Sequence, residues 1–394
     1  MEQLAGSSRL LRAINETAAL GHLLERGPLT RGDLRELTGL AKPTTSDVLR
    51  RLQDAGLAKV VGRTSGGPGP NAEVYAVNPD AAYTAAVSLR ARDNSLATAV
   101  CDLAGTIRAR REIPVESQPN DPVAAVADAV QSACRAARLP LRRIDHVQLG
   151  VPGAYDERAD AIRYVDVPGW SRPGLIGEIR KRLRTEVSVD NDANLAAVAE
   201  RCHGIAGDAE GFALLWLGEE GLGLAIDLGG TLLRGARGGA GEIGYMPVGL
   251  PDRQVADRTG ERASVHDFHE LVSGTAVRKL AASHGIRAAT GHEAVALAVV
   301  RPERAEAFLD ALAIRIAVGL AAVIAVLDPP LVVLSGDVGQ AAGAPLAEAV
   351  MAALRTLSVL QTAVAATGVT DDPVLLGALE ASLGSVRATL LGRR

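Results

Sequence analysis

Hydrophobic and polar positions in the first 60 residues alternate with a period near 3.6, which predicts three short helices. Thr30 can accept backbone N–H bonds as the N-cap of the second helix, and Gly39 stands where that helix should end. Pro43 suits the first position of the third helix, and Gly56 ends it. The apolar positions that carry this pattern are Leu10, Leu11, Ile14, Ala18, Leu20 to Leu24, Leu34, Leu37, Leu40, Val48, Leu49 and Leu52.

A β-hairpin follows the third helix. Residues 57–61 predict a strand, residues 62–70 are rich in Gly and Pro and predict a flexible loop, and residues 73–77 predict the return strand. Three helices followed by such a wing are typical of a winged helix-turn-helix domain, which we place at residues 1–78. Pro79 breaks the strand pattern, so residues 79–82 are the predicted linker.

From residue 83 onward, short apolar runs alternate with helical stretches, which predicts an α/β domain over residues 83–394. The first group of predicted strands is followed by a second, comparable group that starts near residue 211. Two related lobes follow, at about 83–205 and 211–394. The predicted strands are 83–89, 95–101, 146–150, 186–189, 211–216, 223–227, 231–234 and 331–334, and the clearest helices are 122–137, 175–183 and 305–327.

Composition limits the partners that the chain can take. The 394 residues carry a net charge of −4, and residues 1–80 hold 10 Lys and Arg against 9 Asp and Glu, so any nucleic-acid contact must be local. Three cysteines without close spacing indicate neither a disulfide framework nor a thiolate zinc site. We find no signal peptide and no apolar run that approaches the length of a membrane span, and we therefore expect a cytoplasmic protein.

The third helix is the predicted DNA-reading element, because a short helix after a tight turn fits the major groove. Its short polar side chains can approach base edges, its arginines can neutralise phosphates, and Arg63 in the wing can probe the minor groove. The alternative for the whole element is a module for protein contacts with solvated arginines. Separately, Asp47 can cap or pair locally instead of contacting DNA. The candidate DNA-binding residues are Lys42, Thr44, Thr45, Ser46, Arg50, Arg51 and Arg63.

Three motifs in the α/β part resemble a known family. They are Gly150-Val-Pro-Gly153, Asn191-Asp-Ala-Asn194 and Gly238-Gly-Ala-Gly-Glu-Ile-Gly244. In this order and spacing they resemble the ROK family of repressors and sugar kinases, and the winged helix in front points to the repressor branch of xylose and N-acetylglucosamine regulators. The resemblance implies an actin-like, two-lobed sugar kinase fold with a sugar in the cleft.

The resemblance also implies which residues bind the sugar. Asn191, Asp192 and Glu242 should line the cleft, since carboxylates and an amide suit adjacent hydroxyl groups, and Asp192 would be the general base of a kinase. The alternative for Asn191 and Asp192 is helix capping, which is compatible with ligand binding. The candidate ligand-binding residues are Gly153, Asn191, Asp192, Glu242, Tyr245 and His269.

The backbone cradles that would hold ATP phosphates depart from the family's kinases. The expected Asp-x-Gly-Gly-Thr turn is replaced by residues 88–94, and the second cradle has Glu219 and Glu220, which would repel phosphate. The third cradle is Ser335-Gly-Asp337. Asp227-Leu-Gly-Gly-Thr231 spells the missing motif, but it lies in the second lobe, where we expect a hairpin turn. We therefore predict that the protein is not an enzyme and needs no cofactor.

The family's zinc site is also absent from the sequence. Tyr245 replaces its histidine, and residues 245–274 contain no cysteine. His266 and His269 have the spacing to face together, but two histidines without a further soft ligand make a poor zinc site. We predict no metal, and the changes at Tyr245 and His269 leave the identity of the sugar open.

Three functions remain open on the sequence alone. The first is a regulator, a homodimer or homotetramer on a pseudo-palindromic DNA operator, whose cleft binds a sugar or sugar-derived effector. The second is an active ATP-dependent sugar kinase that also binds DNA. The third is a protein whose N-terminal module docks on another protein.

Overall fold

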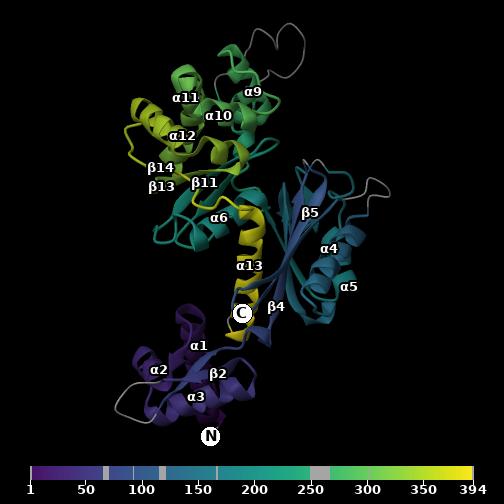
Figure 1. Ribbon diagram of the computed structural model, residues 1–394, viewed down its shortest axis with the longest axis vertical. Helices are drawn as coiled ribbons and strands as arrows, with labels where there is room; N and C mark the ends of the chain where they lie inside the picture. The colour runs from purple at the N-terminus through teal and green to yellow at the C-terminus, as the bar shows by residue number, and fades with distance from the viewer. Residues whose placement is uncertain are drawn as a thin grey trace.

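The computed structural model describes residues 2–64, 71–91, 93–114, 121–165, 167–248, 267–300 and 302–392. Figure 1 shows three parts along the long axis: a winged-helix domain at one end, a first lobe built on a five-stranded sheet, and a second lobe at the other end. The α/β fold with an N-terminal winged helix-turn-helix is confirmed.

The winged-helix domain has the three predicted helices, but the first is long. The elements are α1 (Glu2–Arg26), β1 (Leu29–Thr30), α2 (Arg31–Thr38), α3 (Lys42–Asp54), β2 (Ala58–Arg63) and β3 (Glu73–Val77), with strand order β1-β3-β2. Thr30 caps α2 in a capping box with Asp33, and Gly39 ends it with φ 68°. Both local predictions are confirmed, because a side-chain acceptor and a residue without a Cβ satisfy the two ends of the helix.

The first lobe holds a sheet with strand order β10-β7-β4-β5-β6. Its strands are β4 (Tyr83–Arg90), β5 (Ser95–Asp102), β6 (Ile107–Pro114), β7 (Ile144–Val151) and β10 (Glu186–Asn191). Helices α4 (Pro122–Ala136) and α5 (Leu175–Leu183) cover one face through a shared apolar core. A small hairpin, β8 (Ala154–Asp156) and β9 (Ala161–Arg163), follows β7, and α6 (Asp192–His203) follows β10.

The second lobe has a smaller sheet, with strand order β12-β11-β13-β14. Its strands are β11 (Phe212–Leu217), β12 (Leu222–Asp227), β13 (Leu331–Ser335) and β14 (Ala363–Ala366). Its helices are α8 (Phe268–Val272), α9 (Gly274–Ser283), α10 (Gly291–Val299), α11 (Pro302–Leu327) and α12 (Gly336–Leu357). These helices and strands enclose one large apolar core.

The predicted strand at residues 231–234 is a tight turn with one bridge. Asp227 pairs with Leu232, and Leu228 and Thr231 exchange backbone hydrogen bonds across Gly229 and Gly230. Both glycines have positive φ, 65° and 86°, as a two-residue hairpin turn requires. The hairpin-turn interpretation of this Asp-x-Gly-Gly-Thr segment is therefore confirmed.

We expected no apolar run that approaches the length of a membrane span, but helix α11 contains one. Its segment Ala305–Leu327 has 23 residues and a mean hydropathy of 2.2, enough by length and composition to cross a membrane. Half of the apolar window is buried in the second lobe, and the core helix of a soluble protein passes the same test. One such helix is weak evidence of a membrane span.

The chain does not finish in the second lobe. Helix α13 (Pro373–Leu390), yellow in Figure 1, packs against α6 and against β4 and β7 of the first sheet. The predicted boundary of 211–394 for the second lobe therefore includes a helix that belongs structurally to the first. Gly377 permits this packing, because a Cβ there would collide with the backbone of Leu195 in α6.

The same helix supports the winged-helix domain. Leu383 and Val386 of α13 are buried in one core with Leu20 and Leu23 of α1 and with Leu103, in the turn after β5. The Thr17 hydroxyl donates a hydrogen bond to the Leu391 carbonyl at 2.9 Å. The winged-helix domain is thus packed on the body through a shared apolar core, which the predicted linker at residues 79–82 alone would not provide.

Candidate functional site

The exposed start of α3 is the first candidate surface. Lys42 is exposed, and Thr44 and Ser46 are half-buried, on the face that does not enter the core. The Ser46 hydroxyl donates to the Lys42 carbonyl at 3.0 Å. Lys42, Thr44 and Ser46 therefore present one positive charge and short polar groups at the N-terminal end of the helix, where a neighbouring backbone can come close.

Thr45 does not belong to this surface. Its side chain is buried, with 2 % exposed, and its hydroxyl donates to the Ala41 carbonyl at 3.2 Å. The spacing of i, i+3 and i+4 puts Thr45 on one helix face with Val48 and Leu49, and the structure buries all three. Thr45 is therefore a core residue, and it leaves the set of accessible candidates.

The Asp47 carboxylate forms ion pairs with both arginines of α3, Arg50 and Arg51. Asp47 accepts hydrogen bonds from Arg50 at 2.6 Å and from Arg51 at 2.5 Å, and Arg51 also bonds Glu16 of α1 at 3.1 Å. The hydrogen bond from Arg50 is the main cause that lowers the pKa of Asp47. The local pairing that we considered for Asp47 is confirmed, and Arg50 and Arg51 reach a phosphate only in competition with it.

The wing carries a second carboxylate-centred group. Glu73 lies 3.9 Å from Arg63 and 3.8 Å from Arg31, and it accepts a hydrogen bond from the Tyr75 hydroxyl at 2.7 Å. Arg63 is the most exposed of these, and Arg31 was not predicted as a site residue. The wing tip, residues 65–70, lies outside the described residues.

Two residues predicted for sugar binding lie at the junction of β10 and α6. Asn191 caps α6, because its Oδ1 accepts the Asn194 backbone N–H at 2.7 Å, so the capping role is confirmed. Asp192 begins the helix and accepts the Ala193 N–H at 2.8 Å. Its second carboxylate oxygen makes no further hydrogen bond among the described residues.

Asp192 faces other acidic groups. Burial is the main cause that raises its pKa to about 7, and the charges of Glu242 and Asp337 contribute to this rise. Glu242, at the start of the short helix η3 (Ile243–Tyr245), also has a pKa raised by burial. These two carboxyl groups, one from each lobe, thus lie within electrostatic range of each other.

Glycines shape the backbone around these carboxyl groups. A Cβ on Gly153 would lie 2.5 Å from the Arg163 carbonyl oxygen. Gly238 and Gly241 have positive φ, 75° and 91°, and a Cβ on either would collide with the carbonyl of Tyr155 or Leu224, respectively. Gly153 and Gly238 therefore both lie against the β8–β9 hairpin, and no side chain fits at either position.

Two exposed tyrosines contact each other, and one of them is the predicted ligand residue Tyr245. Tyr164, just after β9, and Tyr245 of η3 have ring centroids 5.4 Å apart at 48°, and they are 59 % and 63 % exposed. Tyr164 was missed by the sequence analysis; its φ of 60° marks a rare backbone conformation that no sequence pattern signalled.

His269 is exposed on α8, close to Gly244, whereas His266 lies outside the described residues. No cluster of metal ligands occurs in the described parts of the chain.

At the position that we predicted as the second cradle, the Glu219 side chain binds the N-terminus of helix α10. The Glu219 carboxylate accepts the backbone N–H groups of Gly291 and His292, each at 2.9 Å, at the N-terminus of α10. The Glu219 N–H in turn bonds the Asp337 carboxylate at 3.3 Å. A carboxylate thus sits where a helix N-terminus would otherwise attract an anion.

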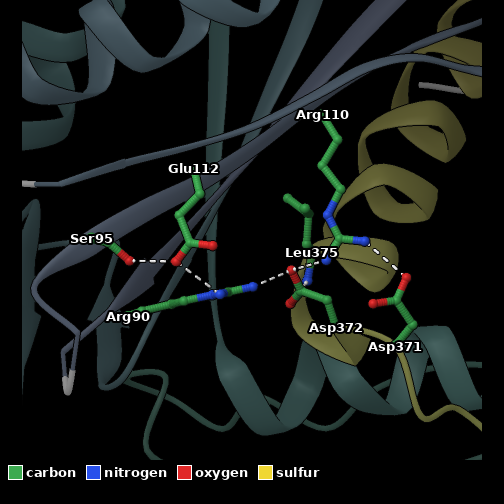
Figure 2. Close-up of polar contacts among 7 residues, drawn as sticks. All are labelled: Arg90, Ser95, Arg110, Glu112, Asp371, Asp372 and Leu375. Atoms are coloured by element: carbon green, nitrogen blue, oxygen red, sulfur yellow. Dashed lines mark hydrogen bonds and ion pairs between the residues drawn. The ribbon is translucent and has the colours of Figure 1, made fainter.

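Arg90, within the residues predicted as the first cradle (88–94), forms an ion pair with the start of α13. Figure 2 shows Arg90, at the end of β4, between Glu112 at 2.9 Å and Asp372 at 2.6 Å. Asp372 also accepts Arg110 at 2.9 Å and caps α13. Since the Asp372 side chain is only 8 % exposed, this group fixes the start of α13 to the edge of the first sheet.

Comparison with known proteins agrees with this geometry. The sequence profile of the ROK family matches residues 87–381, and that of the MarR family matches residues 11–66. The chain belongs to the ROK family. The fold also follows a crystal structure described as a ROK family transcriptional regulator, a homologue of the Escherichia coli MLC protein, with a TM-score of 0.74 over 97 % of this chain and 99 % of that one at 19 % identity.

Two curated relatives of this ROK protein are named as regulators. A putative xylose repressor of Caldicellulosiruptor sp. is 25 % identical over 63 % of this chain and 62 % of its own length. The DNA-binding transcriptional dual regulator NagC of Escherichia coli is 24 % identical over 62 % of this chain and 59 % of its own. The matched region therefore spans less than two thirds of these relatives.

Proposed function

We propose that this ROK protein is a DNA-binding transcription regulator, a repressor whose operator affinity depends on a sugar or sugar-derived ligand in the cleft. One observation carries the proposal: α13 spans the body from the cleft side to the winged-helix domain and shares an apolar core with it. A change between the lobes therefore reaches the domain that would contact DNA. Relatives named as a xylose repressor and as an N-acetylglucosamine repressor support the class of effector.

The cleft in this proposal binds and does not catalyse. Glu219 occupies the N-terminus of α10, and Asp337 adds a second negative charge beside it. Both would repel the phosphates of ATP, since like charges at short distance are strongly unfavourable in a partly buried site. Asp192 and Glu242 can still accept hydrogen bonds from sugar hydroxyl groups.

A homodimer completes the proposal, because two winged helices read a two-fold operator. Helix α11 offers a surface for it: Ile314, Val318 and Val326 are 55 %, 41 % and 82 % exposed along one face. Ala322 and Ala325 continue this exposed apolar strip. Burial of such a strip against its symmetry copy removes apolar area from water.

The deciding experiment is fluorescence anisotropy with DNA from upstream of the protein's own gene, titrated with a panel of sugars. Saturable, sequence-specific binding that one sugar weakens or strengthens is the expected result. Specific binding that no sugar changes removes the effector part of the proposal. Absence of specific binding favours a protein-docking role, and ATP-dependent phosphorylation of a sugar would replace the regulator by a kinase.

Asp47→Asn is expected to strengthen DNA binding. The substitution removes a negative charge from the α3 surface and releases Arg50 and Arg51 for phosphates. We expect an affinity gain of about 3- to 10-fold at low salt and a steeper salt dependence, by about one phosphate contact. Asp128→Asn, an exposed carboxylate on α4, is the control. Equal or weaker binding by Asp47→Asn would show that these arginines do not contact DNA.

Asp192→Asn is expected to change the pH dependence of stability. The pKa of Asp192 is raised from 3.8 to about 7, so its protonated form stabilises the folded state at acid pH, and this contribution is lost as the pH rises through 7. Between pH 5 and pH 8 the free energy of unfolding should fall by on the order of 2 kcal/mol more for the wild type than for the variant. Urea denaturation at both pH values measures this, with Asp310→Asn as the control for an exposed carboxylate. Parallel pH profiles of the wild type and Asp192→Asn would contradict the prediction.

A further inference from the structure

A pocket separate from the predicted sugar cleft lies beside β10. Its volume is about 1030 Å³, and its walls are the edge strand β10, helix α6, residues 230–238 of the second lobe and helix α13. Of the six residues predicted for sugar binding, Asn191 alone lines it. We call it the arginine pocket, because it is lined by Arg158, Arg180, Arg201, Arg234 and Arg237.

Two of these arginines are neutralised. Arg201 bonds the Asp227 carboxylate, and Arg234 donates both Nε and Nη2 to Asp190, at 2.9 and 2.7 Å. These pairs join the second lobe to α6 and to β10, so they form the rigid frame of the arginine pocket. Their charges balance and leave little attraction for a ligand.

The other three arginines retain their charge. Arg180 is fixed by two hydrogen bonds to the Val187 carbonyl, at 2.9 and 2.7 Å, and a carbonyl does not cancel a full charge. Arg158 and Arg237 are exposed and have no ion pair with any described carboxylate. The carboxylate of Asp156 is bound by Arg163 at 2.8 Å, which leaves Glu157 as the opposing charge.

The remaining wall leaves room for a ligand. Ala381, Gly384, Ser385 and Ala388 lie at helical spacing on the side of α13 that faces the arginine pocket. A Cβ at Gly384 would meet no atom within 4 Å, so the space beside this residue is open. The hydroxyl groups of Ser188, Thr231 and Ser385 also line the pocket; that of Ser385 donates to the Ala381 carbonyl at 3.1 Å, and that of Ser188 bonds His146 Nε2 at 3.0 Å.

We propose that the arginine pocket binds a small phosphorylated molecule, whose phosphate is held by Arg158, Arg180 and Arg237. The planar guanidinium group donates paired hydrogen bonds that match phosphate oxygens, and three such groups exceed the charge of the single opposing carboxylate. A volume of about 1030 Å³ accommodates a sugar-sized group beside the phosphate. This site goes beyond the proposed function and does not depend on DNA or on the sugar cleft.

Isothermal titration of the full chain tests the proposal with two probes, inorganic phosphate and glucose 6-phosphate. We expect saturable binding of one probe per chain. Tighter binding of glucose 6-phosphate identifies a phosphorylated organic ligand, and equal binding of both identifies free phosphate as sufficient. Glucose is titrated separately, so a failure of the arginine pocket is distinguished from a failure of the sugar cleft.

Variants locate the binding. Gly384→Leu adds a bulky uncharged side chain to the α13 wall and should weaken binding, and Arg158→Ser with Arg237→Ser should weaken it at least tenfold. Arg278→Ser with Arg287→Ser removes two exposed arginines of the second lobe and should leave binding unchanged. Thermal denaturation confirms that each variant is folded. Absence of saturable binding to the wild type, or equal binding by Gly384→Leu, overturns the proposal.

Discussion

Replacing Gly377 by alanine is expected to destabilise the protein by about 3 kcal/mol, because overpacking of a close helix contact costs this much. A methyl group there would collide with the Leu195 carbonyl and come within 3.1 Å of the Ala199 nitrogen, so α13 and α6 must separate. Urea denaturation followed by circular dichroism measures the loss. DNA binding should weaken too, since α13 supports the winged-helix domain.

Gly384→Ala on the same helix is the matched control. Its added methyl group meets no neighbouring atom, and alanine is the better helix former, so the variant should be more stable by about 0.5 to 1 kcal/mol. Opposite signs for the two substitutions would establish that the α13–α6 contact, and not helix propensity, decides the outcome. A Gly377→Ala protein as stable as the wild type would show that the two helices can shift apart without loss.

Ile314→Asp combined with Val318→Asp is expected to convert a dimer into a monomer and to reduce operator affinity at least 100-fold. Two carboxylates on the exposed face of α11 cannot be buried against a symmetry copy without a large desolvation penalty. A single winged helix then loses the half-site contacts of its partner. Light scattering after gel filtration gives the mass, and anisotropy gives the affinity.

Ile107→Asp is the control for this pair, because Ile107 is an exposed apolar residue of the first lobe, 43 % accessible. It should change neither mass nor affinity. A double variant that remains dimeric would move the interface away from α11. A monomeric wild type with full operator affinity would remove the dimer from the proposal altogether.

Local sequence signals predicted local structure well. Thr30, Gly39 and the Gly229-Gly230 turn were identified because capping and positive φ depend on a few neighbouring residues. The helical spacing of α3 also indicates that Thr45 is buried, since it puts this residue on one face with Val48 and Leu49. Its inclusion among the DNA-binding candidates rested on residue type alone, and the periodicity was the better guide.

Long-range placement was not predictable in the same way. Nothing in the Ala-, Leu- and Gly-rich sequence of α13 indicates that it leaves the second lobe, because small and aliphatic residues suit any apolar partner. The pairing of Asp47 with two arginines was foreseen as a local option, but the arginine pocket was not. Its arginines come from four separate segments, and only the folded chain brings them together.

The contact between Thr17 and Leu391 joins residues 374 positions apart in the chain. During synthesis the winged-helix sequence is made long before Leu383 and Val386, which complete its core. Contacts of such high sequence separation form late in folding. A nascent chain therefore holds an incomplete winged helix until its body has been synthesised, so a winged-helix domain without its body would be the less stable species.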